Sequence, residues 1–466
     1  MLLRHRLPAD LLTPLSAYLA LRSQGASLLL ESADQGERVG RHSFVLLEGE
    51  GEARLDAPGR GWVEAIRALA GPIETAHGEL TPDSELPEGR EFMPTGVGCA
   101  GYLGFEALGA LEPTLALPTR NSLGLPTLWM RRFDAALVFD HLHQVAELQV
   151  RAASQEMAAE RIRILREVLK APVLPADDGG NPIAEPLLSR EAYEAFVRRA
   201  LELIHDGDVY QLVPSQRIKV RRPPSPLTAY RRMRRLNPSP YGFLLEWGGF
   251  ALAGASPEML VRVADGEAET LPIAGTVPRG ADEVEDAARF ETLRSDTKEL
   301  AEHQMLVDLA RNDLGRISIP GGVRVEKPLA LQRTSHVLHL TTTVKGRLRP
   351  GLDALDVLAA CFPAGTVSGA PKIRAAQRIA EMEGDQRGPY GGALLRLASD
   401  GSLDTALILR TAVFSGGDAY LQAGAGVVRA SDPLKEYRET LHKMGAPAAA
   451  LGVDLSAMLQ LGEVAG

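Results

Sequence analysis

The chain has 466 residues, of which 45% are apolar and 24% charged, and this balance is typical of a globular protein rather than a disordered one. Its formal net charge of −9 argues against a nucleic-acid-binding protein. No apolar run approaches the roughly 20 residues that a membrane helix needs, and MLLRHRLPADLL does not read as a secretory signal. Cys99 and Cys361 need not pair, which suits a reducing compartment. We therefore expect a cytoplasmic protein.

The clearest break in the chain is the stretch from Ala171 to Pro186, which is rich in Pro, Gly and Asp. Before it lies a mixed pattern that ends in a predicted helix around residues 157–170. After it the periodicities become stronger. We therefore expect two regions, residues 1–175 and residues 186–466.

The second region alternates predicted helices and hairpins. Ser189 is a helix N-cap, and Gly207 ends that helix. Asn237-Pro238 ends a second helix, and Gly384 ends a third one that begins at Pro371. Strands are predicted over residues 209–220, 243–247, 250–255, 336–346, 390–399, 403–414 and 419–428. Without regular βαβ alternation, this order predicts an α+β fold, with largely antiparallel β-sheets packed together and helices on the outside.

Two predicted helices carry glutamates three residues apart. DTKELAEHQM has Glu299 and Glu302, and SDPLKEYRETLHK has Glu436 and Glu439 after a cap at Ser431 or Asp432. Residues three apart on a helix are neighbours, so each pair is a solvated acidic face, an acid/base pair or half of a metal site. If the helices converge, four carboxylates would require a cation, and an all-oxygen set selects Mg²⁺, Mn²⁺ or Ca²⁺.

Two glycine-rich stretches are candidate ligand contacts. FPAGTVSGAPKIRAA (362–376) lacks the spacing of a Walker motif but feeds small residues into a helix N-terminus, which suits a carboxylate or a phosphate. QAGAGVV (422–428) allows close backbone approach at Gly424 and Gly426. Tight packing of strand on helix explains either stretch equally well.

Arg410 and His339 each allow a structural and a functional interpretation. Arg410 ends an apolar strand and needs an anion, either a structural carboxylate or that of a substrate. A lone histidine such as His339 is more often a satisfied core residue. Cys99 in GVGCAG is not a glutaminase nucleophile, because Val97 stands where the nucleophile elbow needs glycine.

Several motifs together resemble the chorismate-utilising enzymes. They are PIAGTVPRG (272–280), ELAEHQMLVDLARNDLGR (299–316), FPAGTVSGAPKIRA (362–375), YGGA (390–393) and QAGAGVV (422–428). LLLES (28–32) and GYLGFE (101–106) resemble the regulatory region of the same family. The resemblance implies a chorismate-binding catalytic region over residues 186–466 and a regulatory, tryptophan-binding region over residues 1–175.

Residues at two positions distinguish members of this family that catalyse different reactions. Gln211 stands where the water-using members carry a basic lysine, and this indicates amination. Ala274 stands where common aminodeoxychorismate synthases carry lysine. The chain therefore resembles the chorismate-binding subunits of the anthranilate synthases, which are Mg²⁺-dependent lyases of tryptophan biosynthesis. The alternatives are an aminodeoxychorismate synthase and a catalytically silent partner that binds chorismate or tryptophan only.

The resemblance also implies roles for individual residues. Glu258 corresponds to the acid/base glutamate and His339 to the histidine that completes the reaction, with the Thr276 and Thr366 hydroxyls beside the substrate. Glu302 and Glu439 correspond to Mg²⁺ ligands, supported by Glu299 and Glu436. The expected substrate contacts are Gly275, Thr276, Tyr390, Arg410, Gly424, Ala425, Gly426 and Lys443.

The family resemblance implies an inhibitor and a partner as well. LLLES and NPSPY (237–241) correspond to the pocket in which tryptophan inhibits the family. Its expected contacts are Glu31 with the amino group, Ser32 with polar atoms, and Pro240, Tyr241 and Gly242 around the indole. Since no glutaminase is recognisable in the chain, a separate glutamine amidotransferase subunit is expected to supply ammonia in a heterotetramer-like complex.

Overall fold

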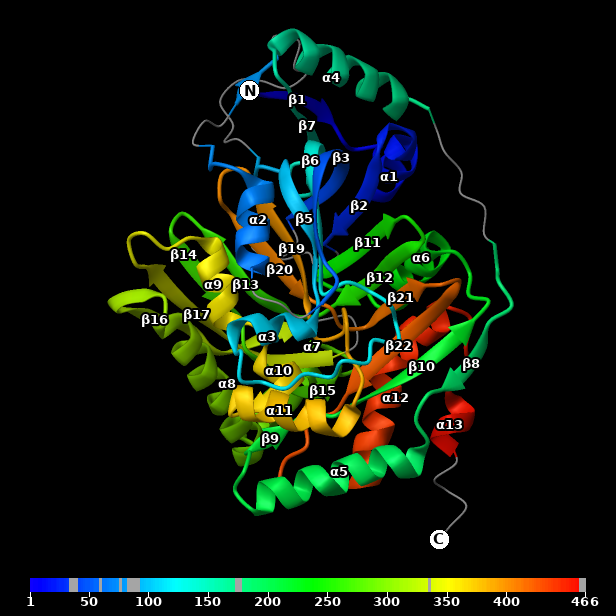
Figure 1. The fold of residues 1–466 in the computed structure, drawn as a ribbon, viewed down its shortest axis with the longest axis vertical. Coiled ribbons are helices and arrows are strands. Elements are labelled where there is room, and N and C mark those ends of the chain that lie inside the picture. Colours follow the sequence, from blue (N-terminus) through cyan, green and yellow to red (C-terminus); the bar gives the residue numbers. More distant parts are fainter. Residues whose placement is uncertain are drawn as a thin grey trace.

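Strands fill the centre of the molecule and helices lie around them (Figure 1). The computed structural model describes residues 1–32, 41–57, 61–74, 78–81, 93–171, 178–333 and 337–460. The middle of the predicted linker, residues 172–177, and His336 of one predicted strand lie outside the described residues. The predicted α+β class with largely antiparallel sheets is confirmed.

One β layer is a long ladder in which the neighbours are antiparallel, apart from a parallel β1–β4 pair at its end. In order of pairing, its strands are β8 (Ile183–Pro186), β10 (Ser215–Arg221), β22 (Asp418–Gly424), β21 (Thr411–Ser415), β12 (Phe250–Ser256), β11 (Tyr241–Trp247), β2 (Ala26–Glu31), β3 (His42–Leu55), β6 (Leu128–Asp140), β7 (Val145–Arg151), β1 (Leu2–Pro8) and β4 (Glu79–Leu80).

A second ladder branches from β6, because the first half of that long strand also pairs with β5. Its strands, in order of pairing, are β5 (Gly98–Leu103), β19 (Ala393–Ala398), β20 (Leu403–Leu407), β13 (Met259–Ala264), β14 (Glu267–Thr270) and β17 (Val337–Leu348), which also pairs with β15 (Ile273–Pro278) and β16 (Ser318–Arg333). The short strands β9 (Gln211–Leu212) and β18 (Gly369–Ala370) pair separately.

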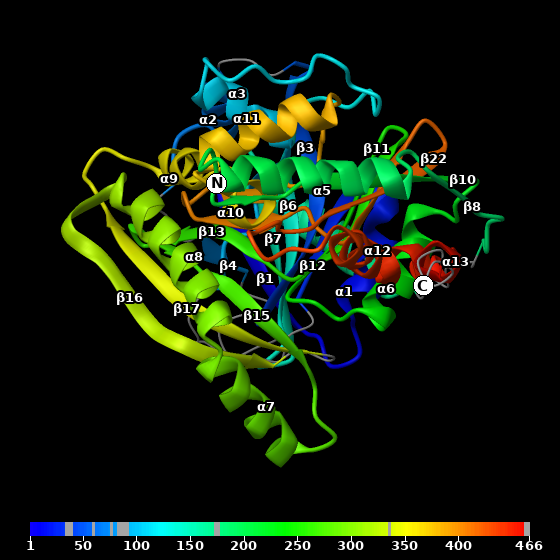
Figure 2. The same cartoon turned by 90° about the horizontal axis from the view of Figure 1, so that it is seen from below.

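The helices lie mainly at the periphery of these ladders (Figures 1 and 2). They are α1 (Pro14–Leu21), α2 (Trp62–Ala70), α3 (Leu108–Leu111), α4 (Gln155–Leu169), α5 (Arg190–His205), α6 (Pro226–Leu236), α7 (Glu283–Ser295), α8 (Thr297–Gly315), α9 (Ala354–Cys361), α10 (Gly365–Ser368), α11 (Lys372–Glu383), α12 (Pro433–Ala450) and α13 (Ser456–Gln460), with 3₁₀ turns at Arg22–Gln24 and Phe105–Ala107.

The predicted helix signals are confirmed. The Ser189 hydroxyl accepts a hydrogen bond from the Ala192 N–H, and the Asp432 carboxylate accepts one from the Lys435 N–H. Gly384 ends α11 in the left-handed conformation, with φ +61°. These signals are local, so neighbouring residues alone determine them.

Two predicted strands are wrong because each of them is split. The strand predicted over 209–220 breaks at Val213-Pro214, where proline has no N–H to donate to a ladder. The strand predicted over 403–414 breaks before β21, and Arg410 there has φ +48°. This second break moves the chain from β19 and β13 to β12 and β22, so residues 390–428, predicted as three strands, form two separate hairpins, β19–β20 and β21–β22.

Aromatic side chains fill a core between the ladders. The Trp129 ring centroid lies 5.4 Å from that of Trp247 and 5.5 Å from that of Phe250, and Tyr102 lies 5.3 Å from Phe250. Strand β11 contributes to this core with one face, and its other face packs against helices. The region predicted as N-terminal therefore shares its hydrophobic core with strands from the second half of the chain.

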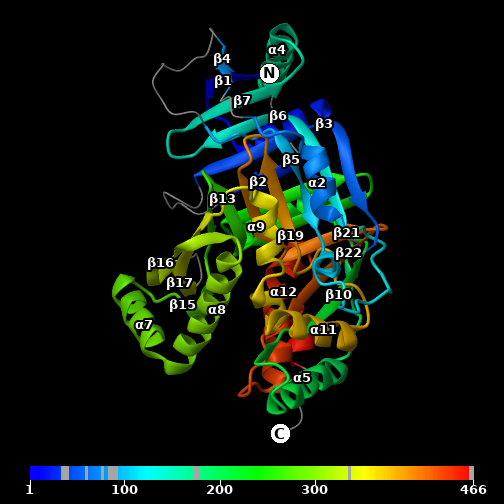
Figure 3. The ribbon, with the colours of Figure 1, turned by 60° about the vertical axis from the view of Figure 1, so that its left-hand side comes forward.

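Helices α7 and α8 pack on β15, β16 and β17 to form a unit that we term the arm, and it stands beside the rest of the molecule (Figure 3). Cys99 in β5 and Cys361 in α9 are both buried and unpaired. Among the described residues, no helix is long and apolar enough to cross a membrane.

Leu244→Ala in β11 is expected to lower the free energy of unfolding by about 2–5 kcal/mol, because its side chain is completely buried between elements that cannot collapse onto the gap. Leu142→Ala is the matched control, since that leucine is 61% exposed in the β6–β7 turn, and it should change stability by less than about 0.5 kcal/mol. Urea unfolding followed by tryptophan fluorescence measures both. Equal losses in the two variants would contradict the assignment of this core.

Candidate active site

Glu258 is a half-buried carboxyl group between β12 and β13. The Thr366 hydroxyl, at the first turn of α10, donates a hydrogen bond of 2.7 Å to Glu258 Oε1. Burial raises the pKa of Glu258 to about 7, against the opposing effects of that hydrogen bond and of the Lys443 charge. A carboxylic acid with a pKa near neutrality can give up a proton and recover it at physiological pH.

His339 and Thr276 face each other across the β15–β17 pair. His339 Nδ1 lies 3.1 Å from Thr276 Oγ1 and 3.3 Å from the Gly275 carbonyl oxygen. Burial lowers the pKa of His339; the Gly275 hydrogen bond raises it, and the nearby Arg410 charge lowers it further. The imidazole is therefore neutral at pH 7 and can accept a proton.

Gly275 forms a bulge in β15 with φ +65°, where the register with β17 shifts. A Cβ at this position would lie 2.8 Å from Leu293 Cδ1 and 3.3 Å from Glu299 Oε2. Any other residue would have to adopt a left-handed conformation that L side chains rarely adopt, and the Leu293 side chain would have to shift. The bulge thus brings Glu299 of α8 close to the backbone beside His339.

Arg410 has no structural counter-ion in the part of the chain that the structure describes, where no carboxylate lies within ion-pair distance of its guanidinium. Burial lowers its pKa, and the charge of Arg410 reaches His339. Of the two interpretations of this residue, the structure favours an anion that comes from a ligand.

The predicted backbone contacts lie beside Tyr390. A Cβ on Gly424 would lie 2.9 Å from Tyr390 Oη, and a Cβ on Gly426 would lie 3.0 Å from Gln211 Nε2. Lys443 Nζ donates to the Gly424 carbonyl oxygen at 3.0 Å. The Ala425 N–H donates to the Pro214 carbonyl. These contacts bring segments from β9, β22 and α12 together with Tyr390.

The four glutamates of the predicted metal site are not gathered into a cage. Among the described residues, no three His, Cys, Asp or Glu side chains lie in an arrangement that could hold a metal ion. Helix α8 packs on the arm strands, whereas α12 packs on α5, α6 and β22. Lys443 Nζ forms an ion pair of 2.7 Å with Glu439. The donor set has the all-oxygen chemistry that suits Mg²⁺, and the metal site stays a prediction.

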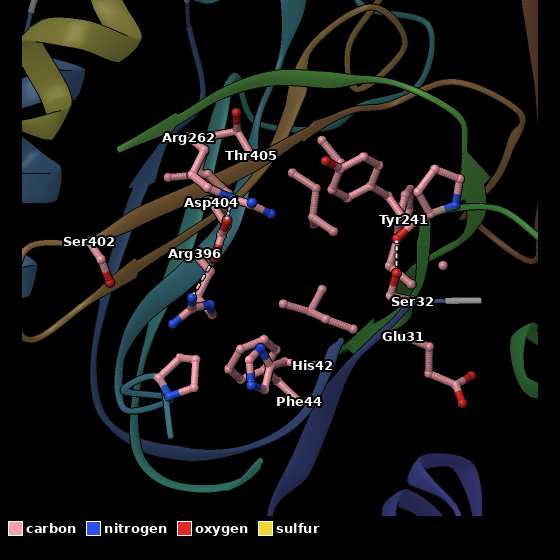
Figure 4. Close-up of a pocket in the computed structure, with 18 of the residues that line it drawn as sticks. Glu31, Ser32, His42, Phe44, Tyr241, Arg262, Arg396, Ser402, Asp404 and Thr405 are labelled. Atoms are coloured by element: carbon pink, nitrogen blue, oxygen red, sulfur yellow. Dashed lines mark hydrogen bonds and ion pairs between the residues drawn. The ribbon is translucent and has the colours of Figure 1, made fainter. Parts of the chain in front are cut away.

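The five residues predicted to bind tryptophan all line one cavity of about 400 Å³ (Figure 4). The Ser32 hydroxyl donates to the Pro240 carbonyl at 2.8 Å, which joins the end of β2 to the residue before β11. Glu31 points away from the cavity, and its carboxylate accepts hydrogen bonds from Tyr230 at 2.6 Å and Arg234 at 3.0 Å. The Glu31 carboxylate is thus paired within the chain, and its contact with an amino group stays a prediction.

The opposite wall of this cavity carries charged residues that the sequence did not reveal. Arg262 Nε lies 2.7 Å from Asp404 Oδ1, and Arg396 Nη2 lies 2.6 Å from Asp404 Oδ2 (Figure 4). Arg396 also stacks on Phe44, with 4.3 Å between its guanidinium carbon and the ring centroid. In the sequence, Arg396 is marked by being the one charged residue in the apolar strand ALLRLA. This pattern does not show that Asp404 is the residue with which it pairs.

Comparison with known families identifies the chain. Residues 26–449 match the family model described as chorismate binding enzyme. The chain belongs to this family. It is 40% identical over 458 residues to the anthranilate synthase component 1 of Pseudomonas aeruginosa, covering 93% of this chain and 92% of the relative. It is 42% identical over 443 residues to the same component of Thermus thermophilus, covering 93% and 94%.

A solved structure agrees with these sequence relatives. The anthranilate synthase component I of Streptococcus pneumoniae superposes with a TM-score of 0.79 at 33% identity, over 95% of this chain and 98% of that one. The family resemblance inferred from the motifs is therefore confirmed over nearly the whole chain.

Glu258→Gln is expected to stabilise the protein at alkaline pH. Because the folded pKa of Glu258 is about 7, above the ordinary value of 4.5, the contribution of this carboxyl group to stability is fully present below about pH 4.5 and is lost as the pH rises through 7. Glutamine stays neutral and can still accept from Thr366. The variant should unfold with a free energy higher by up to about 3 kcal/mol at pH 8.5 and near wild type at pH 5. Urea titrations at both pH values measure this, and a pH-independent difference would contradict the shifted pKa.

Proposed function

We propose that this chain is the component I subunit of an anthranilate synthase, which converts chorismate and ammonia to anthranilate, pyruvate and water. The observation that carries the proposal is that one chain holds both Glu258, a carboxyl group with a pKa near 7 bonded to Thr366, and His339, an imidazole kept neutral beside Thr276. The relatives that are named anthranilate synthase component 1, at about 40% identity, support the same activity.

The residues divide the proton transfers between them. Glu258 protonates the 4-hydroxyl group of chorismate, which leaves as water while the nitrogen lone pair of ammonia forms a bond to ring carbon 2. His339 is unprotonated at neutral pH and can accept the ring proton when pyruvate is eliminated. The Thr366 hydroxyl fixes the orientation of Glu258, and Thr276 does the same for His339.

The substrate carboxylates have separate partners in this proposal. Arg410 and Tyr390 bind the enolpyruvyl carboxylate, which supplies the anion that the Arg410 guanidinium needs. The backbone at Gly275, Gly424, Ala425 and Gly426 lies against the substrate. Glu302 and Glu439, supported by Glu299 and Glu436, would hold Mg²⁺, which when bound neutralises the ring carboxylate. In this structure, the ammonium group of Lys443 forms an ion pair with Glu439 and neutralises its charge.

Gln211 and Ala274 support ammonia as the nucleophile rather than water. Because no glutaminase nucleophile is recognisable in this chain, a partner amidotransferase is proposed to release ammonia from glutamine within a complex of both subunits. The two unpaired cysteines fit a cytoplasmic location.

The purified chain is expected to produce the blue fluorescence of anthranilate from chorismate, Mg²⁺ and an ammonium salt, without a partner subunit. The assay is best run at alkaline pH, where more of the ammonium is present as ammonia. Glu302→Gln should lower turnover by at least about 100-fold, whereas Glu291→Gln, on the exposed face of α7, should leave it unchanged. Accumulation of isochorismate, salicylate or 4-amino-4-deoxychorismate, identified by chromatography, would reject the proposal. Full turnover by Glu302→Gln would reject the metal assignment.

We also propose that L-tryptophan binds the 400 Å³ cavity and inhibits the enzyme. Ser32→Leu is expected to raise the inhibitory concentration of tryptophan by at least about tenfold, because the larger side chain fills the cavity and removes the hydrogen bond to Pro240. Ser23→Leu, at an exposed position in the turn before β2, is the matched control. Unaltered inhibition of the Ser32 variant would place the inhibitor elsewhere.

A further inference from the structure

The antiparallel pairing of β5 with β19 brings two distant segments together at one end of the ladder. Leu103 is opposite Ala393, so Glu106 and Tyr390 each lie three residues beyond the same pair. The Phe105 N–H donates to the Gly388 carbonyl at 2.8 Å, which extends the contact past the end of the strands. Glu106 therefore lies against the segment that leads into Tyr390.

Glu106 is completely buried and holds this segment by its backbone. Its Oε1 accepts a hydrogen bond from the Arg387 N–H at 2.6 Å, and its Oε2 accepts one from the Gly388 N–H at 3.0 Å. A carboxylate that accepts two N–H groups at once fixes the backbone in both position and direction. The residue comes from the N-terminal half of the chain, yet the backbone that it holds belongs to the substrate region.

The Arg387 guanidinium is buried as well and forms hydrogen bonds to three separate segments. Nε and Nη2 donate to the two oxygens of Glu383, at 2.8 and 2.6 Å. Nη1 donates to the Val367 carbonyl at 2.7 Å, and Nη2 also donates to the Val213 carbonyl at 2.6 Å. Its guanidinium carbon lies 5.5 Å from the Tyr390 ring centroid, within the range of a cation–π interaction.

Each of these contacts adjoins a residue that the proposed function assigns to the substrate. Val367 follows Thr366, which holds Glu258. Val213 precedes Pro214, whose carbonyl accepts from Ala425. The ring of Tyr390 is in contact with the guanidinium itself. The partner of the guanidinium, Glu383, accepts in turn from the Ser215 N–H and hydroxyl, at 2.7 and 2.9 Å.

We propose that Arg387 is a positioning residue for chorismate binding, and that Glu106 holds Arg387 and Tyr390 in place from the N-terminal half of the chain. This inference rests on the proposed function and assigns a role to Arg387, which lies outside the quoted motifs, and to Glu106, the last residue of GYLGFE, which the sequence analysis gave no role of its own. The planar guanidinium of Arg387 sets the distances between Tyr390, the Thr366 segment and the Gly424–Gly426 backbone. Lysine has one nitrogen and cannot span the three directions that the guanidinium spans.

The test compares Arg387→Lys and Glu106→Gln with the wild-type chain, with Arg378→Lys as the matched control. Arg378 lies on α11 and forms ion pairs with Asp208 and Glu381. We measure KM for chorismate and kcat with ammonium as nitrogen donor, and the dissociation constant of chorismate by calorimetry. Arg387→Lys should raise KM and the dissociation constant by at least about tenfold, because it misplaces groups that bind the substrate.

Glu106→Gln should raise both constants by at least about threefold, since an amide can accept from only one of the two N–H groups. Arg378→Lys should leave both within about twofold of wild type. A purely structural role for Arg387 would reduce the folded fraction, and thus kcat, without changing KM. Unchanged KM and chorismate affinity in Arg387→Lys would overturn the proposal, and if that variant does not fold, Glu106→Gln decides by the same criterion.

The two proposals fail in distinguishable ways. A wild-type chain that binds chorismate but forms no anthranilate would reject the proposed function, and the calorimetric comparison would still decide the role of Arg387. A wild-type chain that is fully active beside an Arg387→Lys variant with normal KM would reject the positioning role alone.

Discussion

Backbone pairing between strands from opposite halves of the chain is the constraint on which the rest of this structure depends. Strand β2 pairs with β11 and β5 pairs with β19, so the first 175 residues cannot separate from the second half without breaking two ladders and the aromatic core between them. Unpaired strand edges with apolar faces are unfavourable in water, so these pairings stabilise the two halves against each other. The two-region division inferred from the linker stays a prediction about function.

Both candidate sites lie where these pairings end. The cavity of about 400 Å³ opens beside β2 and β11, between Ser32 on one side and Asp404 on the other. The Glu106–Arg387 contacts lie where β5 and β19 end, next to Tyr390. Side chains at the end of a strand are held in fixed positions by the hydrogen-bonded ladder, and they also face a space that the ladder does not fill. A ligand can therefore reach side chains whose positions are fixed, as a binding site requires.

Buried charged residues in the active-site region differ in whether they are paired with an opposite charge. Arg387 is buried and fully paired, whereas no carboxylate in the described chain lies at ion-pair distance from Arg410. Burial costs the charged form of Glu258 enough to raise its pKa to about 7. Paired charges fix the shape of the site, and the less compensated ones are available for ligands and protons. This division follows from the cost of burying a charge without a partner.

The sequence by itself determined the features that depend on neighbouring residues. The caps at Ser189 and Asp432, the helix end at Gly384 and the antiparallel class follow from local hydrogen bonding and side-chain periodicity. The motifs identified the family and most of the candidate site residues. Only the tertiary structure decided where β20 and β21 separate at Arg410, that Glu31 turns to Tyr230, and that Glu106 meets Arg387 across 281 positions of sequence. Those outcomes depend on which strands pair and in which register, and this is fixed by packing over the whole chain rather than by any local pattern.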